Sequence, residues 1–262
     1  MENEKENKFL FILAVTLLAV LTAMVFIKTF MFDKNKEEKI DVPESLIDEL
    51  YSYIDIKNLN NEISFYGDNY INSQNLGYTT IAKMTYNYIN KYDNLKIESV
   101  NDTDKSLFKE DGTLLNKIKI NDFEEDVTSV ISKSNFGLNE HFNKFDIDEN
   151  TSAYIKGEYL FIYKRNEPID SNYVSYRGLI SYTLLDNANK IQLTEYYLIC
   201  DKISKNCYDS NNEYDSNNEE KNTYITYSED LNVSTMIDKL KKYVHTFEKI
   251  GEKYKWISVE GL

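Results

Sequence analysis

An apolar run near the start of the chain restricts most strongly what this sequence can form. It covers Phe9–Ile27, nineteen residues without a charged side chain and with two threonines as the only polar interruptions. As an α-helix it would be roughly 28 Å long, close to the ~30 Å hydrocarbon thickness of a bilayer. We therefore expect a transmembrane anchor at residues 9–32, which allows for helix tilt and for Lys28 to snorkel toward the membrane surface.

The same run favours a retained anchor over a cleaved signal peptide. Signal peptides have a shorter apolar region that ends in a cleavage site of small residues. Here the segment Leu21-Thr22-Ala23 begins with a bulky leucine, and further apolar residues follow it. No cysteine follows the run for lipid attachment. The sequence thus predicts a single-pass membrane protein with a short tail at 1–8, the anchor at 9–32 and a charged linker at 33–41.

Residues 42–262 are predicted to form one soluble domain. This body is long enough for a sizeable core, and it contains most of the tyrosines and phenylalanines of the chain. Residues 1–40 contain equal numbers of lysines and acidic residues, so the net charge of −14 lies on the body. A surface of that sign repels phosphate backbones, which argues against nucleic acid as a partner.

Two signals disagree about the side of the membrane on which the body lies. Lysines are more numerous after the apolar run than before it, which does not favour a cytoplasmic N-terminal tail. The only two cysteines, Cys200 and Cys207, flank a predicted hairpin turn and are well placed for a disulfide, which persists only outside the cytosol. Long domains translocate largely regardless of flanking charge. We therefore expect an extracytoplasmic body with a Cys200–Cys207 disulfide; the alternative is two reduced thiols.

Hydrophobic periodicity predicts helices in the first part of the body. Apolar residues three and four apart indicate helices that begin near Asp41, extend over Thr79–Tyr92, and follow Asn121-Asp122. Between them the sequence predicts short strands at Ile63–Tyr66 and Leu95–Val100 and a polar loop at Asn101–Gly112.

From Ser152 onward the period of the pattern changes to two, which predicts antiparallel hairpins. These hairpins join Ser152–Ile155 to Tyr159–Lys164, Tyr176–Leu185 to Ile191–Cys200, and Tyr243–Ile250 to Lys253–Glu260. Residues 208–222 contain YDSNNE twice and are predicted to form a mobile acidic loop. A short strand at Thr223–Tyr227 and a short helix at Ser234–Lys242 complete an expected α+β fold, with helices packed on an antiparallel sheet.

The terminal hairpin also carries a resemblance. Its sequence, Tyr243-Val-His-Thr-Phe-Glu-Lys followed by Tyr254-Lys-Trp-Ile-Ser-Val-Glu, resembles the end of uncharacterised membrane-anchored proteins of low-GC Gram-positive bacteria. Short matches at Leu50–Ile54, Ile81–Met84 and Phe136-Gly137 fit the same pattern. The resemblance implies no activity, cofactor or site residue. The order of helices before strands is also similar to that of NTF2-like cone folds, which have a pocket between sheet and helices.

The sequence offers few groups for catalysis. Motifs of serine hydrolases, zinc proteases and phosphate-binding loops are absent. Only His141 and His245 would titrate near neutral pH. We expect His141 to be a solvated loop residue and His245 to be a structural or exposed residue of the last hairpin.

One acidic segment is a weak metal candidate. Asp146, Asp148 and Asn150 place oxygen atoms at the first three ligand positions of a calcium loop. The match ends there, because Thr151 stands where the sharp turn needs glycine and Gly157 stands where a bidentate glutamate belongs. We therefore expect an ordinary acidic loop and no cofactor.

Together these features favour a membrane-anchored extracytoplasmic domain that binds a protein or envelope component without catalysis. The lipid bilayer is the expected partner of residues 9–32, and an envelope protein is an expected partner of the body. The alternative is an enzyme or small-ligand binder with an NTF2-like pocket lined by tyrosines and carboxylates. A deep pocket with converging buried carboxylates or His141 would favour the alternative.

Overall fold

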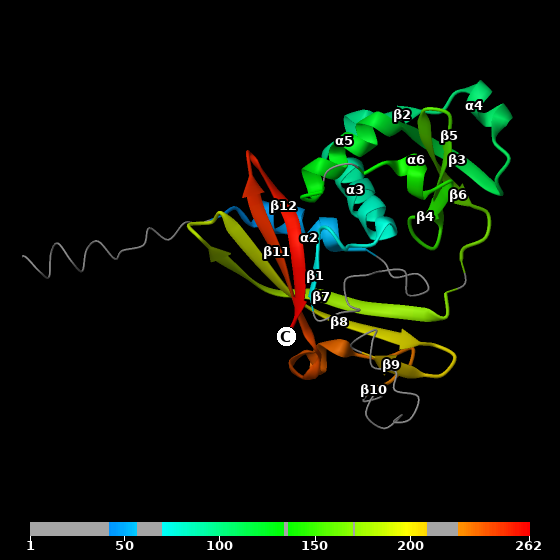
Figure 1. Ribbon diagram of the computed structural model, residues 1–262. Coiled ribbons are helices and arrows are strands. Elements are labelled where there is room, and N and C mark those ends of the chain that lie inside the picture. The colour runs from blue at the N-terminus through cyan, green and yellow to red at the C-terminus, as the bar shows by residue number, and fades with distance from the viewer. Residues whose placement is uncertain (1–41, 57–69, 134–135, 170, 209–224) are drawn as a thin grey trace, which may run out of the picture. The chain divides into compact units, whose positions relative to one another are not determined.

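The longer helices follow the periodicity of the sequence. In the computed structural model, which describes residues 42–56, 70–133, 136–169, 171–208 and 225–262, these helices are α2 (Glu44–Ile54), α3 (Tyr78–Tyr92) and α5 (Ile120–Val130) (Figure 1). α2 and α5 each bury one mainly apolar face, whereas α3 is buried on all sides over residues 80–85. In α2 that face consists of Ile47, Leu50, Tyr53 and Ile54 at helical spacing.

Several expected segments lie outside the described residues: the tail at 1–8, the anchor at 9–32, the linker at 33–41, the strand at Ile63–Tyr66 and, beyond Tyr208, the acidic loop at 208–222. Within the described ranges, no helix combines the length and the hydrophobicity needed to cross a bilayer. Residues Pro43–Leu262 group into one compact unit.

Two short helices occupy segments without a predicted helix. α4 (Asp102–Leu107) lies in the expected polar loop, and α6 (Leu138–His141) follows Gly137. The α4 helix forms because of a reciprocal cap: the Asp104 N–H donates to Asn101 Oδ1 at 2.8 Å, and the Asn101 N–H donates to Asp104 Oδ2 at 2.9 Å. This cap compensates for the absence of a buried residue in α4.

The strands form two antiparallel sheets instead of the single sheet that the sequence predicts. The larger sheet, sheet A, has seven strands in the order β1-β12-β11-β8-β9-β10, with β7 paired to the other side of β8. Its strands are β1 (Tyr70–Asn72), β7 (Tyr173–Leu185), β8 (Lys190–Asp201), β9 (Asn206–Tyr208), β10 (Ile225–Thr226), β11 (Lys242–Ile250) and β12 (Lys253–Gly261). The short β1 pairs with the far end of the chain, Tyr70 opposite Glu260 and Asn72 opposite Ser258.

The smaller sheet, sheet B, has five strands in the order β2-β3-β6-β5-β4. These are β2 (Ile97–Ser99), β3 (Gly112–Lys119), β4 (Lys144–Asp146), β5 (Thr151–Lys156) and β6 (Tyr159–Arg165). The predicted hairpin of β5 and β6 is confirmed. Strand β3 is longer than its sequence pattern indicates, because a bulge between Leu114 and Asn116 leaves Leu115 exposed and interrupts the alternation of inward and outward residues.

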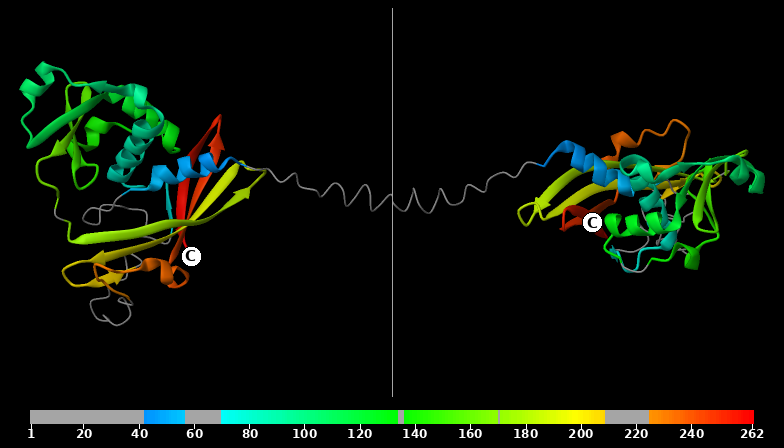
Figure 2. Two further views of the ribbon diagram at one scale, coloured as in Figure 1. Left: turned by 180° about the vertical axis from the view of Figure 1, so that it is seen from behind. Right: turned by 90° about the horizontal axis from the view of Figure 1, so that it is seen from above.

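Helices connect the two sheets. α3 packs on α5, and α5 contacts β3 of sheet B and β12 of sheet A. The end of α5 is attached to sheet A at Ile131, which forms a parallel bridge with Trp256. Figure 2 shows α2, in blue, beside the red strands of sheet A. The Tyr53 ring of α2 lies 6.4 Å from the Phe247 ring of β11, measured between centroids.

The described residues also form three 3-10 helices: η3 (Asn94–Lys96), η4 (Val233–Thr235) and η5 (Ile237–Lys239). The last two replace the short helix expected at Ser234–Lys242. Lys242 itself begins β11, so the residues before it have no room for a longer helix.

Candidate functional site

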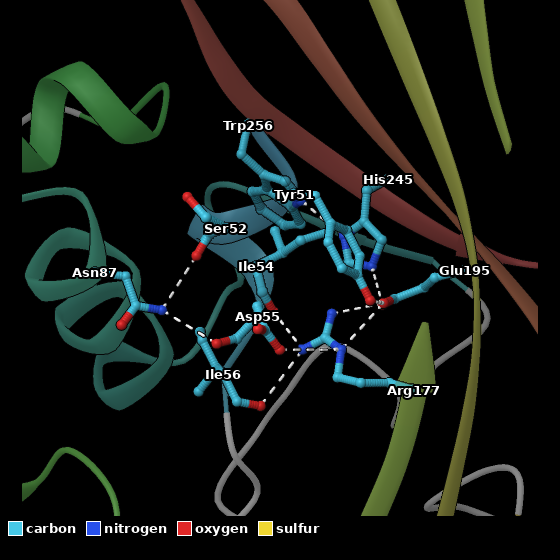
Figure 3. Close-up of polar contacts among 10 residues, drawn as sticks. All are labelled: Tyr51, Ser52, Ile54, Asp55, Ile56, Asn87, Arg177, Glu195, His245 and Trp256. Atoms are coloured by element: carbon cyan, nitrogen blue, oxygen red, sulfur yellow. Dashed lines mark hydrogen bonds and ion pairs between the residues drawn. The ribbon is translucent and has the colours of Figure 1, made fainter. Parts of the chain in front are cut away.

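Four side chains from four strands of sheet A form a continuous buried polar chain. They are Arg177 on β7, Glu195 on β8, His245 on β11 and Trp256 on β12 (Figure 3). They share one face because of the register of the four strands and because β8 alternates up to Tyr197, with Ile191, Leu193, Glu195 and Tyr197 all buried. A carboxylate therefore stands in a row of apolar residues.

Glu195 is paired with a cation. Arg177 donates to Glu195 Oε2 through Nη2 at 2.6 Å and through Nε at 3.1 Å. The side chain of Glu195 is 0% exposed and that of Arg177 is 8% exposed. The Tyr51 hydroxyl on α2 also donates to Oε2, at 3.3 Å. These contacts offset the free-energy cost of removing a carboxylate from water.

His245 is neutral in this arrangement. Its Nδ1 accepts a hydrogen bond from Trp256 Nε1 at 3.1 Å, and an indole nitrogen can only donate. The proton of the imidazole must then sit on Nε2, which lies 2.7 Å from Glu195 Oε1 and donates to it. Burial lowers the pKa of His245, and the neighbouring Glu195 carboxylate opposes that shift. Both ring nitrogens are engaged inside the core.

Arg177 also holds the end of helix α2. Its Nη1 donates to the carbonyl oxygens of Ile54 and, at 3.4 Å, of Ile56. A cation at this position is favourable because the last carbonyls of a helix carry partial negative charge. From the other side, Asn87 Nδ2 on α3 donates to the carbonyl of Ser52 at 3.3 Å and to that of Asp55 at 3.2 Å (Figure 3). The C-terminal end of α2 is thus attached to both sheet A and α3.

A pocket of about 290 Å³ lies next to Arg177. It is lined by Asp55, Ile56, Ser175, Tyr176, Arg177 and Tyr196. Neither Glu195 nor His245 belongs to the lining, so the guanidinium of Arg177 separates the pocket from the buried carboxylate and imidazole. From the described residues, the pocket therefore offers the Ser175 hydroxyl, two tyrosine side chains, the Arg177 guanidinium and the Asp55 carboxylate.

The residues of the weak metal candidate do not converge on a shared cation site. Asp146 Oδ1 accepts from Arg165 Nη1 at 2.5 Å and from Ser152 Oγ at 2.7 Å. Asp148 Oδ1 accepts the backbone N–H groups of Asn150 and Thr151, both at 2.8 Å. Their carboxylates shape the turn between β4 and β5. In the described part of the chain, no three or more His, Cys, Asp or Glu side chains form a group that could hold a metal ion.

The structure places His141 differently from the expectation. Instead of a solvated loop residue, it is a half-buried residue at the end of α6, and its ring stacks on Tyr78 with 3.5 Å between the centroids. Phe136 and Phe142 lie 5.8 Å and 6.4 Å from it, also measured between centroids. The ring contributes to a small aromatic cluster.

Cys200 and Cys207 face each other across β8 and β9 and are joined by a disulfide. Both are fully buried and pack with Leu198, Val233 and Leu240. The disulfide lies on the face of sheet A opposite to Glu195, because Cys200 is five residues further along the same strand.

Sequence reasoning missed Arg177 and Glu195. Each left a signal: Arg177 is one of only two arginines in the chain, and Glu195 occupies an inward position of an alternating strand. An acid at such a position must be paired, and Arg177 lies in the strand that precedes it in the predicted hairpin. His245 was considered, but its burial depends on α2 covering the sheet.

No model of a known protein family matches the chain, and no curated protein or solved structure matches it.

Proposed function

We propose that this is a single-pass membrane protein whose extracytoplasmic α+β domain, residues 42–262, binds a protein or envelope component without catalysis. One observation carries the proposal: the side chains best suited to acid–base chemistry are consumed in structural contacts. The two ring nitrogens of His245 are bonded to Glu195 and Trp256, and Glu195 is bonded to Arg177. The Glu195 and His245 side chains are fully buried.

The pocket supports binding more than catalysis. The carboxylate in its lining belongs to Asp55, whose side chain is 61% exposed. Among the described residues, no histidine and no second carboxylate lines the same space, so this part of the lining lacks an acid–base pair. The missing acid–base pair argues against the enzyme in the alternative hypothesis, which is an enzyme or small-ligand binder with an NTF2-like pocket. In an NTF2-like cone the pocket would lie between one sheet and the helices that cover it.

The membrane location rests on the sequence and on the cysteines. The apolar run at 9–32 supplies the anchor, and the Cys200–Cys207 disulfide fits a compartment outside the cytosol. Membership among the membrane-anchored proteins that the terminal hairpin resembles is part of the same proposal. The acidic body of such a protein would face the envelope with a net charge of −14.

The test is topology in intact cells. After removal of any wall, added protease should digest the chain beyond about residue 34, while a cytoplasmic marker protein stays intact as the control. Alkylation under non-reducing conditions should leave both cysteines unmodified. Protection of the body until the membrane is broken, together with two alkylated thiols, would overturn the extracytoplasmic assignment.

A further inference from the structure

Strand β7 has a long edge with few of the usual protections. It contains 13 residues and, among the described residues, pairs with β8 alone. Sheet edges are normally protected by charged side chains, by proline or by a covering segment. The only charged residue of β7 is Arg177, whose guanidinium is bound to Glu195, whereas Ile180 and Tyr182 are exposed. A bulge between Leu179 and Ser181 divides the strand and leaves Tyr173–Leu179 as a regular segment.

The pocket lies along this edge. Its lining includes Ser175, Tyr176 and Arg177, three consecutive residues of one strand. Because consecutive side chains of a strand point to opposite faces of the sheet, a space that touches all three lies beside the strand rather than on one face. The pocket therefore lies where a chain that paired with the backbone of β7 would pass, and no described segment occupies that edge.

Tyr196 reaches the same edge across a glycine. Gly178 is the register partner of Tyr196, and a Cβ built on Gly178 would lie 2.7 Å from Tyr196 Cε1 and 2.9 Å from its hydroxyl oxygen. The missing side chain leaves room for the tyrosine ring to lie over the backbone of β7. An aromatic face thereby becomes part of the pocket lining.

The charges of the pocket favour a cation. The Arg177 guanidinium lies between two carboxylates: its Nη2 is 2.6 Å from Glu195 Oε2, and its Nε is 4.0 Å from Asp55 Oδ1. These three groups together carry one net negative charge, and the Asp55 carboxylate, 61% exposed, is the accessible one of the two acids. Tyrosine rings and a carboxylate together suit a lysine or arginine side chain. The net charge of −14 also favours a partner segment that is basic.

We propose that β7 is a strand-addition site. An extended segment of a partner polypeptide pairs with the backbone of Tyr173–Leu179 and places a lysine or arginine side chain in the pocket beside Asp55. This proposal rests on the proposed function as a binding module, and it names the docking surface and the chemistry of the partner. Main-chain hydrogen bonds would provide affinity, and the pocket would select the cation.

A second copy of this chain is a poorer occupant. Two bodies that each carry −14 repel one another. An antiparallel pair of two β7 strands would also bring no free cation to either pocket, because Arg177 is held by Glu195 in each copy.

The test uses the full-length protein in detergent micelles and fluorescent nine-residue probes. The first probe is Thr-Val-Thr-Val-Lys-Val-Thr-Val-Thr, and the matched probe has glutamate in place of the lysine. Fluorescence polarisation should show that the lysine probe binds about tenfold more tightly than the glutamate probe, a difference of about 1.4 kcal/mol. When the lysine probe is bound, amide hydrogen exchange of the protein should slow at Tyr173–Leu179 and should not change in β3 of the other sheet.

Two protein variants separate the contribution of Asp55 from that of net charge. Asp55→Asn should remove most of the preference for the lysine probe. Asp186→Asn, which changes the net charge equally at an acid 64% exposed in the turn after β7, should leave the preference unchanged. Trp256 fluorescence confirms that each variant is folded, and the comparison of the two probes on the unmodified protein requires no variant.

Several outcomes would overturn the proposal. Unchanged exchange in β7 with both probes would exclude strand addition, and equal affinity of the two probes would exclude the cation site. A concentration-dependent dimer that blocks the lysine probe would assign the edge to a second copy. A cytoplasmic body in the protease assay would overturn the proposed location instead, and the probe results would not depend on it.

Discussion

The two arginines of the chain should differ sharply in their effect on stability. Arg177 and Glu195 are 8% and 0% exposed, whereas Arg165 and Asp146 form an ion pair with side chains 26% and 30% exposed. Replacing either arginine with methionine keeps much of the apolar stem and removes the charge. Arg165→Met is thus a matched control for Arg177→Met.

The expected magnitudes follow from burial. Arg177→Met leaves the carboxylate of Glu195 in the core without a cation, and it removes the donors to the Ile54 and Ile56 carbonyls. Breaking a buried pair in this way costs about 3–5 kcal/mol. The Arg165–Asp146 pair is half-buried and remains accessible to water, so it should contribute only about 0–1 kcal/mol. At roughly 2–4 °C per kcal/mol for a domain of this size, Arg177→Met should lower Tm by about 6–20 °C.

Trp256 makes the measurement direct. It is the only tryptophan and it is buried in the core, so its fluorescence reports unfolding of the body. Urea titration of the full-length protein in detergent at pH 7.5 gives the free energy of unfolding for each variant. The double variant Arg177→Met with Glu195→Gln should recover part of the loss, because no unpaired charge remains. If Arg177→Met costs no more than Arg165→Met, the reasoning about the buried pair is refuted.

Three further predictions concern pH, the disulfide and the anchor. Burial lowers the pKa of His245, so the unfolded chain takes up the proton first as pH falls. The contribution of neutral His245 to the free energy of unfolding is therefore complete above about pH 6.5. Below that pH it decreases by up to about 1.4 kcal/mol per pH unit until the pKa of the folded state is reached. In His245→Gln this part of the dependence should disappear from urea titrations between pH 7.5 and pH 5. Replacing Cys200 and Cys207 with serine should leave the body folded but less stable by about 2–3 kcal/mol, because the closed loop is short; failure of the double variant to fold in circular dichroism would contradict this. Alkaline carbonate should leave the full chain in the membrane pellet and release a variant that lacks residues 1–32, whereas an intact chain in the wash would rule out the anchor.

Local patterns predicted the parts of the fold that depend on neighbouring residues. The hairpins β7–β8 and β11–β12 follow from alternation and turn residues, and both are confirmed. Strand β1 has only three residues, and its pairing is with β12, so no nearby signal marks it. Strand β3 is hidden by its bulge, where Leu115 faces outward.

The candidate site was less predictable than the fold. Alternation places Glu195 on the inner face of β8, so a buried acid can be inferred from sequence. The partners of Glu195 cannot be inferred from sequence. Its contact with Arg177 depends on the register of the bulged β7, and its contact with Tyr51 depends on where α2 crosses the sheet. The neutral state of His245 depends in turn on a donor, Trp256, from the next strand. Each of these contacts is tertiary.

The pairing of β1 with β12 sets an order for folding. Tyr70 and Glu260 are register partners although about 190 residues separate them in the sequence. A contact of that range closes a very long loop, so it forms late and slowly relative to the local hairpins. Because the ribosome makes the chain from its N-terminus, residues 70–72 remain unpaired until β12 has emerged. After β12 has emerged and until β1 pairs with it, the edge of β12 at Ser258–Glu260 is open to mispairing, and the chain would benefit from a chaperone that covers it.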